Sequence, residues 1–211
     1  MTPTPPFHAL AMNRVVHELQ RHPATSAGSD VIVTASVQRP AQTSGDNDPA
    51  FLTLHYVLEG QTDNLRMPPK ATGGICDGLW QHTCAELFVR TRGASAYQEF
   101  NFSPSGQWAA YRFSSERQRD SEAEARDPAS APLIEVQATR HRTTLHVRLP
   151  MRNVALGNGA ETLWLGLNMV TEHADGSLAY WALRHPRVDR PDFHHPDGCT
   201  LPLQWPAPAT P

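Results

Sequence analysis

Short runs of alternating apolar and polar residues recur along this chain and constrain its fold more than any other feature. The clearest runs are 31–37, 52–58, 87–89, 144–149 and 163–169, and others lie near 97–102, 107–113, 133–139, 178–183 and 200–204. A period of two is the spacing of side chains along a β-strand. About ten such runs, each bounded by Gly, Pro, Asn or Asp, are typical of an antiparallel sandwich or barrel. The sequence therefore predicts an all-β fold.

The connections between these runs agree with antiparallel pairing. Ser-Pro-Ser-Gly at 103–106 can reverse the chain between two runs, and Asp175-Gly176 can close a hairpin. Helical spacing is rare and is best at 9–21, where the pattern ends before Pro23. A short helix is also expected at 120–126. We therefore predict a mainly β chain with a short N-terminal helix.

The chain length suits one domain. With 211 residues it can bury a sizeable core, and no composition shift marks a second unit. We expect an N-terminal extension with the short helix over 1–29, one β-sandwich or barrel domain over 30–205 and a Pro-rich tail over 206–211. The segment 41–49 reads as a polar loop and 114–131 as a long connection.

Composition excludes several classes of partner. The net charge is −3 and no basic run occurs, so nucleic acid is not expected as a ligand. No stretch of 18 apolar residues occurs, so no membrane span is expected. The first residues lack the basic and apolar parts of a secretory signal, which favours a cytoplasmic protein. The three cysteines are an odd set, which favours free thiols, although a Cys84–Cys199 or Cys76–Cys84 bridge stays open.

Polar side chains gather on the faces of three neighbouring runs. Alternation places Glu86 with Arg90 on one face, and Glu99 with Asn101 on one face of the next run. Charged and amide side chains that bind hydroxyls, beside an aromatic ring that stacks on a sugar, suit the recognition of a neutral polyol. A simpler interpretation is that this face of the sheet is exposed to solvent and binds nothing.

Three longer strings resemble a known group of proteins. They are DGLWQHTCAELF at 77–88, YQEFNFSPSGQWAAY at 97–111, and AYWALRHP at 179–186 followed by PDFHHP at 191–196. Together they resemble the bacterial DOMON-like domain proteins, a group related in fold to the DOMON cytochrome domains and to the family 9 carbohydrate-binding modules. The resemblance spans roughly 30–205. It implies a two-sheet antiparallel β-sandwich of immunoglobulin-like or jelly-roll style.

The resemblance also implies a binding role, with sugar and haem as the ligand types of the wider group. Glu86, Glu99 and Asn101 resemble the polar strand residues of the sugar-binding modules, and Trp80 and Trp181 resemble their stacking aromatics. We therefore expect non-catalytic binding of a carbohydrate or similar small polar ligand. The candidate ligand-binding residues are Trp80, Glu86, Glu99, Asn101, Trp108, Arg112 and Trp181.

Haem binding is the leading alternative, because DOMON cytochromes hold haem with Met and His. Possible axial ligands here are Met67, Met169, His185 and His194. No CxxCH occurs, so covalent attachment is excluded, and no cofactor is expected on the main hypothesis.

Three further alternatives have weaker support in the sequence. Histidines and acids crowd residues 185–199 without the spacing of a structural zinc site, so no metal is expected. Glu86 and Glu99 could act as a glycosidase pair, yet no catalytic motif accompanies them. The long 114–131 connection and the Pro-rich ends could contact a protein partner, although nothing specific points to one.

Overall fold

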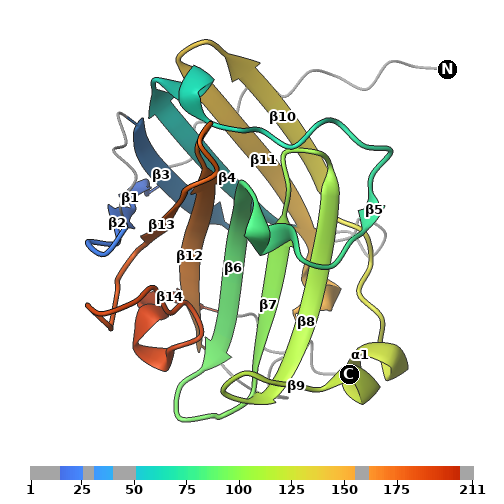
Figure 1. Ribbon diagram of the computed structural model, residues 1–211. Helices are drawn as coiled ribbons and strands as arrows, with labels where there is room; N and C mark the ends of the chain where they lie inside the picture. The colour runs from blue at the N-terminus through green and yellow to red at the C-terminus, as the bar shows by residue number, and fades with distance from the viewer. Residues whose placement is uncertain (1–14, 26–30, 40–50, 155–161, 205–211) are drawn as a thin grey trace, which may run out of the picture.

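Two stacked β-sheets make up the computed structural model of this protein (Figure 1). The structure describes residues 15–25, 31–39, 51–154 and 162–204. The sheets are a β-sandwich, and its strand pairs are antiparallel except for β5 with β8. The expectation of an all-β, two-sheet antiparallel fold is confirmed.

The smaller sheet has five strands in the order β1-β3-β4-β11-β10. Their bounds are β1 His17–Glu18, β3 Val31–Gln38, β4 Phe51–Gly60, β10 Leu133–Thr139 and β11 Arg142–Pro150. Apolar residues of β4 and β11 alternate in burial, as a half-buried strand requires.

The larger sheet has nine strands and carries the candidate site. Its main path is β2-β13-β12-β6-β7-β8-β5, while β14 pairs with β12 and β9 with β8. Its bounds are β2 Gln20–Arg21, β5 Gly74–Ile75, β6 Cys84–Thr91, β7 Tyr97–Phe102, β8 Gln107–Ser115, β9 Gln118–Arg119, β12 Thr162–Glu172, β13 Leu178–Ala182 and β14 Leu201–Gln204. β6 and β7 lie near the middle, and nearly all their residues are buried on both faces.

Helical structure is brief. In the described segments α1, Ser121–Arg126, is the only α-helix, and the Asp120 side chain accepts a hydrogen bond from the backbone N–H of Ala123 at its start. The 3₁₀ turns are η1 Thr62–Asn64, η2 Leu79–Gln81, η3 Met151–Asn153 and η4 Pro196–Gly198. Among the described residues no helix has the length and apolar character needed to cross a membrane.

The structure confirms most of the expected elements. Every run of alternating residues named above contains a strand, the turns at 103–106 and at Asp175-Gly176 join antiparallel strands, and α1 matches the helix expected at 120–126. The three cysteines are free thiols, so neither candidate bridge is present. The loop expected at 41–49 and the tail at 206–211 lie outside the described residues.

The expected N-terminal helix is wrong wherever it can be checked. Residues 9–14 lie outside the described part, and 15–21 contain the short strands β1 and β2. Val15 and Val16 are exposed, and Leu19 is buried while its backbone N–H donates to the Val33 carbonyl at 2.8 Å. The segment extends the edges of both sheets, so pairing with strand edges outweighs the weak helical spacing.

The main core lies between the two sheets. Leu52, Leu54, Leu145 and Val147 from the smaller sheet belong to one buried cluster with the inward residues of the larger sheet. At its centre the Tyr56 hydroxyl donates to the Glu86 backbone carbonyl at 2.7 Å, which satisfies a polar group that would otherwise be costly to bury.

Candidate functional site

The outer face of the larger sheet carries an unusual set of buried polar and aromatic side chains. Ala85, Leu87 and Val89 of β6 belong to the core between the sheets, so Glu86 and Phe88 point to the other face. Pairing aligns Glu86 with Asn101 of β7 and with Asn168 of β12. Strand register therefore places these three side chains in one row across the sheet.

The next row of the same face is partly aromatic. Phe88 of β6 pairs with Glu99 of β7, and Glu99 pairs with Tyr111 of β8. A third row holds Tyr97 paired with Phe113, and their rings stack with centroids 4.5 Å apart. The outer face thus combines two carboxyl groups with an aromatic wall.

The chain between β13 and β14 covers part of this face. We call residues 191–199 the cap segment. Arg90 donates to the His194 backbone carbonyl at 2.5 Å, and the Tyr97 hydroxyl lies 2.7 Å from His194 Nδ1. The Arg117 guanidinium donates to the buried Asp192 carboxylate at 2.7 Å. These contacts, from strands β6 and β7 and from the turn between β8 and β9, hold the cap segment in place.

The close approach of the cap segment to the sheet explains why residue 166 of β12 is a glycine. A Cβ added at Gly166 in β12 would lie 3.3 Å from Cys199 Sγ and 3.4 Å from Phe88 Cβ. These distances are tighter than ordinary van der Waals contact. Gly166 therefore lets the cap segment lie directly on the sheet.

A cavity of about 350 Å³ lies between the sheet face and the cap segment, and we call it the central cavity. Its aromatic lining is Trp80, Phe88, Tyr111, Phe113, Tyr180 and Phe193, and its polar lining is Glu86, Glu99, Arg117, Arg119 and His194. The volume lies within the range of about 300–1,000 Å³ that is usual for small-molecule sites.

Burial dominates the electrostatics of the two carboxyl groups. It raises the pKa of Glu99 to about 7, against the lowering effects of the Asn101 hydrogen bond and of Arg117 and Arg119. It raises the pKa of Glu86 well above its usual value, and the nearby Glu99 adds to the shift. Both groups therefore bind protons in a pH range where an exposed Glu is ionised.

The carboxyl group of Glu86 is buried without a partner in the described part of the chain. The residue is 2% exposed, and no described residue hydrogen-bonds or pairs with its carboxyl group. Asn101 donates from Nδ2 to Glu99 Oε1 at 2.9 Å, while its Oδ1 has no partner among the described residues. Buried polar groups without partners are costly, and of these two residues only Glu86 lines the central cavity, where a ligand could supply hydrogen bonds.

Arg119, Tyr111 and His194 of the central cavity already have partners. Arg119 pairs with Glu124 at 2.9 Å and lies over the Tyr111 ring, and the Tyr111 hydroxyl donates to Asp77 at 2.7 Å. Burial, with Arg117 and Arg90 nearby, lowers the pKa of His194 to about 4. His194 is therefore neutral near pH 7.

Trp80 stands at the mouth of the central cavity, on η2. It is 43% exposed, and its ring meets Tyr111 edge-on with centroids 6.0 Å apart. A large, half-exposed aromatic ring beside a cavity is well placed to stack on a ligand.

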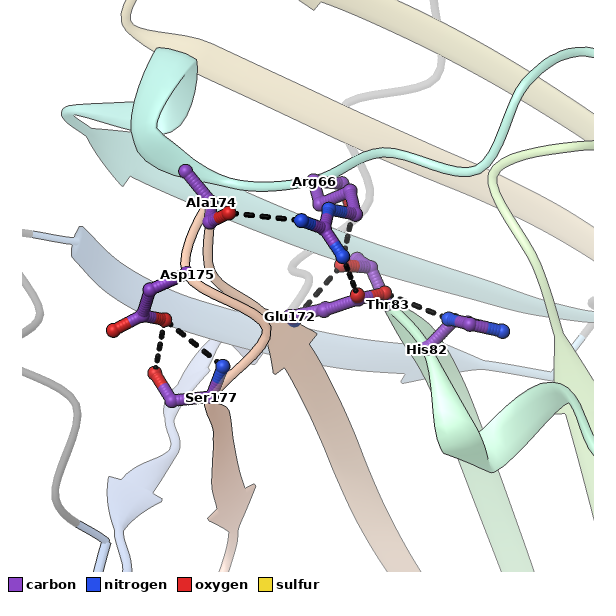
Figure 2. Close-up of polar contacts among 7 residues, drawn as sticks. All are labelled: Arg66, His82, Thr83, Glu172, Ala174, Asp175 and Ser177. Carbon is purple, nitrogen blue, oxygen red and sulfur yellow. Dashed lines mark hydrogen bonds and ion pairs between the residues drawn. The ribbon is translucent and has the colours of Figure 1, made fainter.

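The buried acid Glu172 anchors chain segments that precede and follow η2 (Figure 2). Glu172 at the end of β12 binds Arg66 and His82, each at 2.7 Å. The Thr83 hydroxyl donates to the Arg66 carbonyl at 2.8 Å and accepts from the Glu172 backbone N–H at 3.0 Å. The network ties the residues on either side of η2 to the β12–β13 hairpin.

The structure brings together four of the seven sequence-predicted site residues. Trp80, Glu86 and Glu99 line the central cavity, and Asn101, which is fully buried and does not line it, donates to Glu99. Whether they bind a ligand stays a prediction.

The other three predicted residues lie elsewhere. Trp108 and Trp181 are buried in the core between the sheets, and the Trp181 indole donates to Thr171 at 3.0 Å. Arg112 binds Asp127 at 2.5 Å beside a separate cavity of about 160 Å³, which Trp108 also lines. All three point to the inner face of the sheet, so they are not grouped with Glu86.

The candidate haem ligands are also dispersed. Met169 is fully buried in the core, on the opposite sheet face from His194. Met67 lines a different cavity, and the His185 ring binds the Gln20 carbonyl at 2.7 Å. Within the described segments no group of three or more His, Cys, Asp or Glu side chains is arranged to hold a metal ion.

Sequence reasoning missed the rest of the central cavity. Tyr111 and Phe113 alternate with Trp108, and the short turn at 103–106 pairs Phe102 with Trp108. That pairing puts Trp108 on the core face, so the two other aromatics could have been assigned to the outer face. Phe193 and His194 come from an irregular segment, and no sequence pattern indicates where it packs.

Comparisons with known proteins support the fold. No family model matches the chain, and no curated protein matches it. A solved structure of a candidate carbohydrate-binding protein from Bacteroides uniformis matches with a TM-score of 0.52 and 16% identity, covering 87% of this chain and 84% of that one.

Two further matches are family 9 carbohydrate-binding modules from Caldicellulosiruptor kristjanssonii, each with a TM-score of 0.48. The complex with cellotriose is 9% identical and covers 80% of this chain and 73% of that one. The complex with glucose is 8% identical and covers 80% and 75%.

Proposed function

We propose that this protein binds a carbohydrate or a similar small polar ligand in the central cavity, without turnover. The observation that carries the proposal is the Glu86 carboxyl group, which lines the cavity, is 2% exposed and has no partner among the described residues. A sugar hydroxyl would supply the missing hydrogen bonds. A protonated carboxyl group both donates and accepts, so it suits hydroxyl groups well.

The aromatic lining supports the same class of ligand. Trp80 is exposed at the mouth, and Tyr111 and Phe193 line the cavity, so the C–H face of a sugar ring has several rings on which to stack. The Bacteroides protein of the same fold carries a carbohydrate-binding description, which makes sugars the first ligands to test. The finer assignment to the DOMON-like group rests on the three sequence strings, and the cytoplasmic location stays a prediction.

Titration calorimetry with a panel of monosaccharides and disaccharides, together with tryptophan fluorescence, tests this proposal. We expect saturable binding by at least one sugar and a fluorescence change that Trp80→Phe abolishes. Trp164→Phe is the matched control, because Trp164 lines a different cavity. If no sugar on the panel binds the folded protein, carbohydrate binding in this cavity is wrong.

A further inference from the structure

In the central cavity the arginines form ion pairs with carboxylates, whereas the Glu86 carboxyl group forms none with any residue that the structure describes. Its two arginines already have carboxylates of their own, Asp192 for Arg117 and Glu124 for Arg119. The carboxyl group of Glu86 has no hydrogen-bond or ion-pair partner among the described residues. Glu99 accepts from the Asn101 amide, lies 3.8 Å from the His194 ring, which is neutral near pH 7, and is influenced by Arg117 and Arg119, which are paired with other carboxylates. Glu86 is thus the acid of the cavity that, in the described part of the chain, lacks a cation.

The rings around these acids add a second preference for positive charge. The faces of aromatic rings attract cations, and the attraction is strongest where water is excluded. The cavity shows this already, since the Arg119 guanidinium lies 4.5 Å from the centre of the Tyr111 ring. Trp80, Phe88, Tyr180 and Phe193 line the same space.

We propose that the ligand of the central cavity carries a protonated amine placed against Glu86, so that the sugar class is an amino sugar. This inference rests on the proposed function and narrows it. The ammonium group would donate to the Glu86 carboxylate and lie beside the aromatic lining, while hydroxyl groups of the same ligand would reach the Glu99 carboxyl group, which lines the same cavity.

Binding of such a ligand is coupled to a proton. The protonated Glu86 carboxyl group loses its proton to solvent, and the resulting carboxylate pairs with the R–NH₃⁺ group, so one proton is released for each ligand bound. Affinity for the protonated amine should therefore rise with pH. Other ionisable or charged groups on the elements packed around Glu86 are Tyr56, Cys84, Arg90, Glu99, Tyr111, Arg117, Arg119, Tyr180 and His194.

Calorimetry with glucosamine, glucose and N-acetylglucosamine tests the inference on the intact chain. Glucose lacks the charge, and N-acetylglucosamine keeps the nitrogen without it. At about pH 6 we expect glucosamine to bind about tenfold more tightly than glucose, with proton release seen as a binding heat that depends on the ionisation heat of the buffer. Equal affinities for glucosamine and glucose would overturn the amine assignment and leave sugar binding standing.

The variant Glu86→Gln separates the charge from the shape of the site. We expect it to abolish the preference for glucosamine over glucose and the proton release. Glu122→Gln on the exposed side of α1 is the control for net charge and should keep both. A preference that survives Glu86→Gln would overturn the role of Glu86. If none of the three sugars binds the folded protein, the amine inference and the proposed function both fail for this set.

Discussion

At the scale of single residues, the two buried carboxyl groups dominate what this molecule can do. A carboxyl group inside a protein normally has a cation or several donors close by. Glu99 has one amide donor, and Glu86 has none among the described residues. Burying them lowers the stability of the fold once they ionise, and a bound ligand would offset that cost. The residues that weaken the free protein are therefore the ones that point to a ligand.

Glu99 gives the first prediction. Its pKa is raised from 4.5 to about 7, so the folded state binds more protons than the unfolded state in this interval. The contribution of Glu99 to the free energy of unfolding should be fully present below pH 4.5 and be lost as the pH rises through about 7. Glu99→Gln keeps an acceptor for Asn101 and removes the titration. We expect it to gain about 1–3 kcal/mol relative to the wild type between about pH 5 and pH 8.

Urea unfolding at about pH 5 and at about pH 8 measures the free energy of unfolding of the wild type and of Glu99→Gln, and Glu122→Gln is the control. A wild-type protein whose stability does not change across this range, or a variant with the same pH dependence as the wild type, would contradict the raised pKa.

Tyr97 gives the second prediction at this scale. Its hydroxyl contacts the His194 ring at 2.7 Å and accepts from the Arg117 backbone N–H at 3.0 Å. Tyr97→Phe leaves both groups without that partner, so we expect a loss of about 1–2 kcal/mol in the free energy of unfolding. Tyr180→Phe is the matched control, because no described residue hydrogen-bonds to the Tyr180 hydroxyl. Equal effects in the two variants would show that Tyr97 does not hold the cap segment.

At the scale of elements, strand alternation carried the correct part of the sequence analysis. Side chains two apart share a face, so Glu99 and Asn101 could be grouped without a structure. The prediction that Trp108 binds a ligand is wrong in its placement, because Trp108 lies in the core between the sheets. Alternation separates the two faces of a strand without showing which face meets the core. The prediction of a helix in the N-terminal segment is wrong for a related reason. Its apolar residues are too few to set a period, and its pairing with strand edges depends on distant parts of the chain.

The network around Glu172 gives the prediction at this scale. Burial raises its pKa, and the hydrogen bonds and charges of His82 and Arg66 outweigh this, so the pKa is lowered from 4.5. Its stabilising effect is thus present above pH 4.5 and is lost as the pH falls through the lower folded value. Glu172→Gln should destabilise the protein by about 1–3 kcal/mol near neutral pH, and less in acid.

Chemical denaturation near pH 7 and below pH 4 checks the Glu172 effect. Glu59→Gln is the control, because Glu59 forms an exposed pair with Arg142 on the other sheet. Such surface pairs are worth about 0–1 kcal/mol, so the control should change stability little. If the two variants lose the same amount, Glu172 does not act as an anchor of the chain around η2.

At the scale of the whole molecule, the sandwich and the cap segment differ in how they are held. The sheets share one large core, whereas the cap segment has the single 3₁₀ turn η4 and is fixed by side-chain contacts such as Arg117 with Asp192. The alternating runs predicted the sheets because side chains alternate between the two faces in every strand. The cap segment has no such periodicity, so the position of Phe193 in the central cavity could not be derived from the sequence.

The three free thiols report on both parts of the molecule. Cys76 is half-buried, Cys84 lies fully buried in β6, and Cys199 is 8% exposed in the cap segment. Burial raises the pKa of Cys84 well above its usual value and that of Cys199 to about 11, and the thiolate is the reactive form. In the native protein we therefore expect fast modification of Cys76 alone.

The two slow thiols should then react in order. Cys199 can become accessible when the cap segment opens locally, whereas Cys84 requires disruption of the central strands. Mass spectrometry of a thiol-labelling time course measures both rates, and Cys76→Ser should remove only the fast step. In urea below the unfolding midpoint, the Cys84 rate should follow global unfolding while the Cys199 rate exceeds it. Labelling of Cys84 and Cys199 at one common rate would instead show that the cap segment and the sandwich unfold as a single cooperative unit.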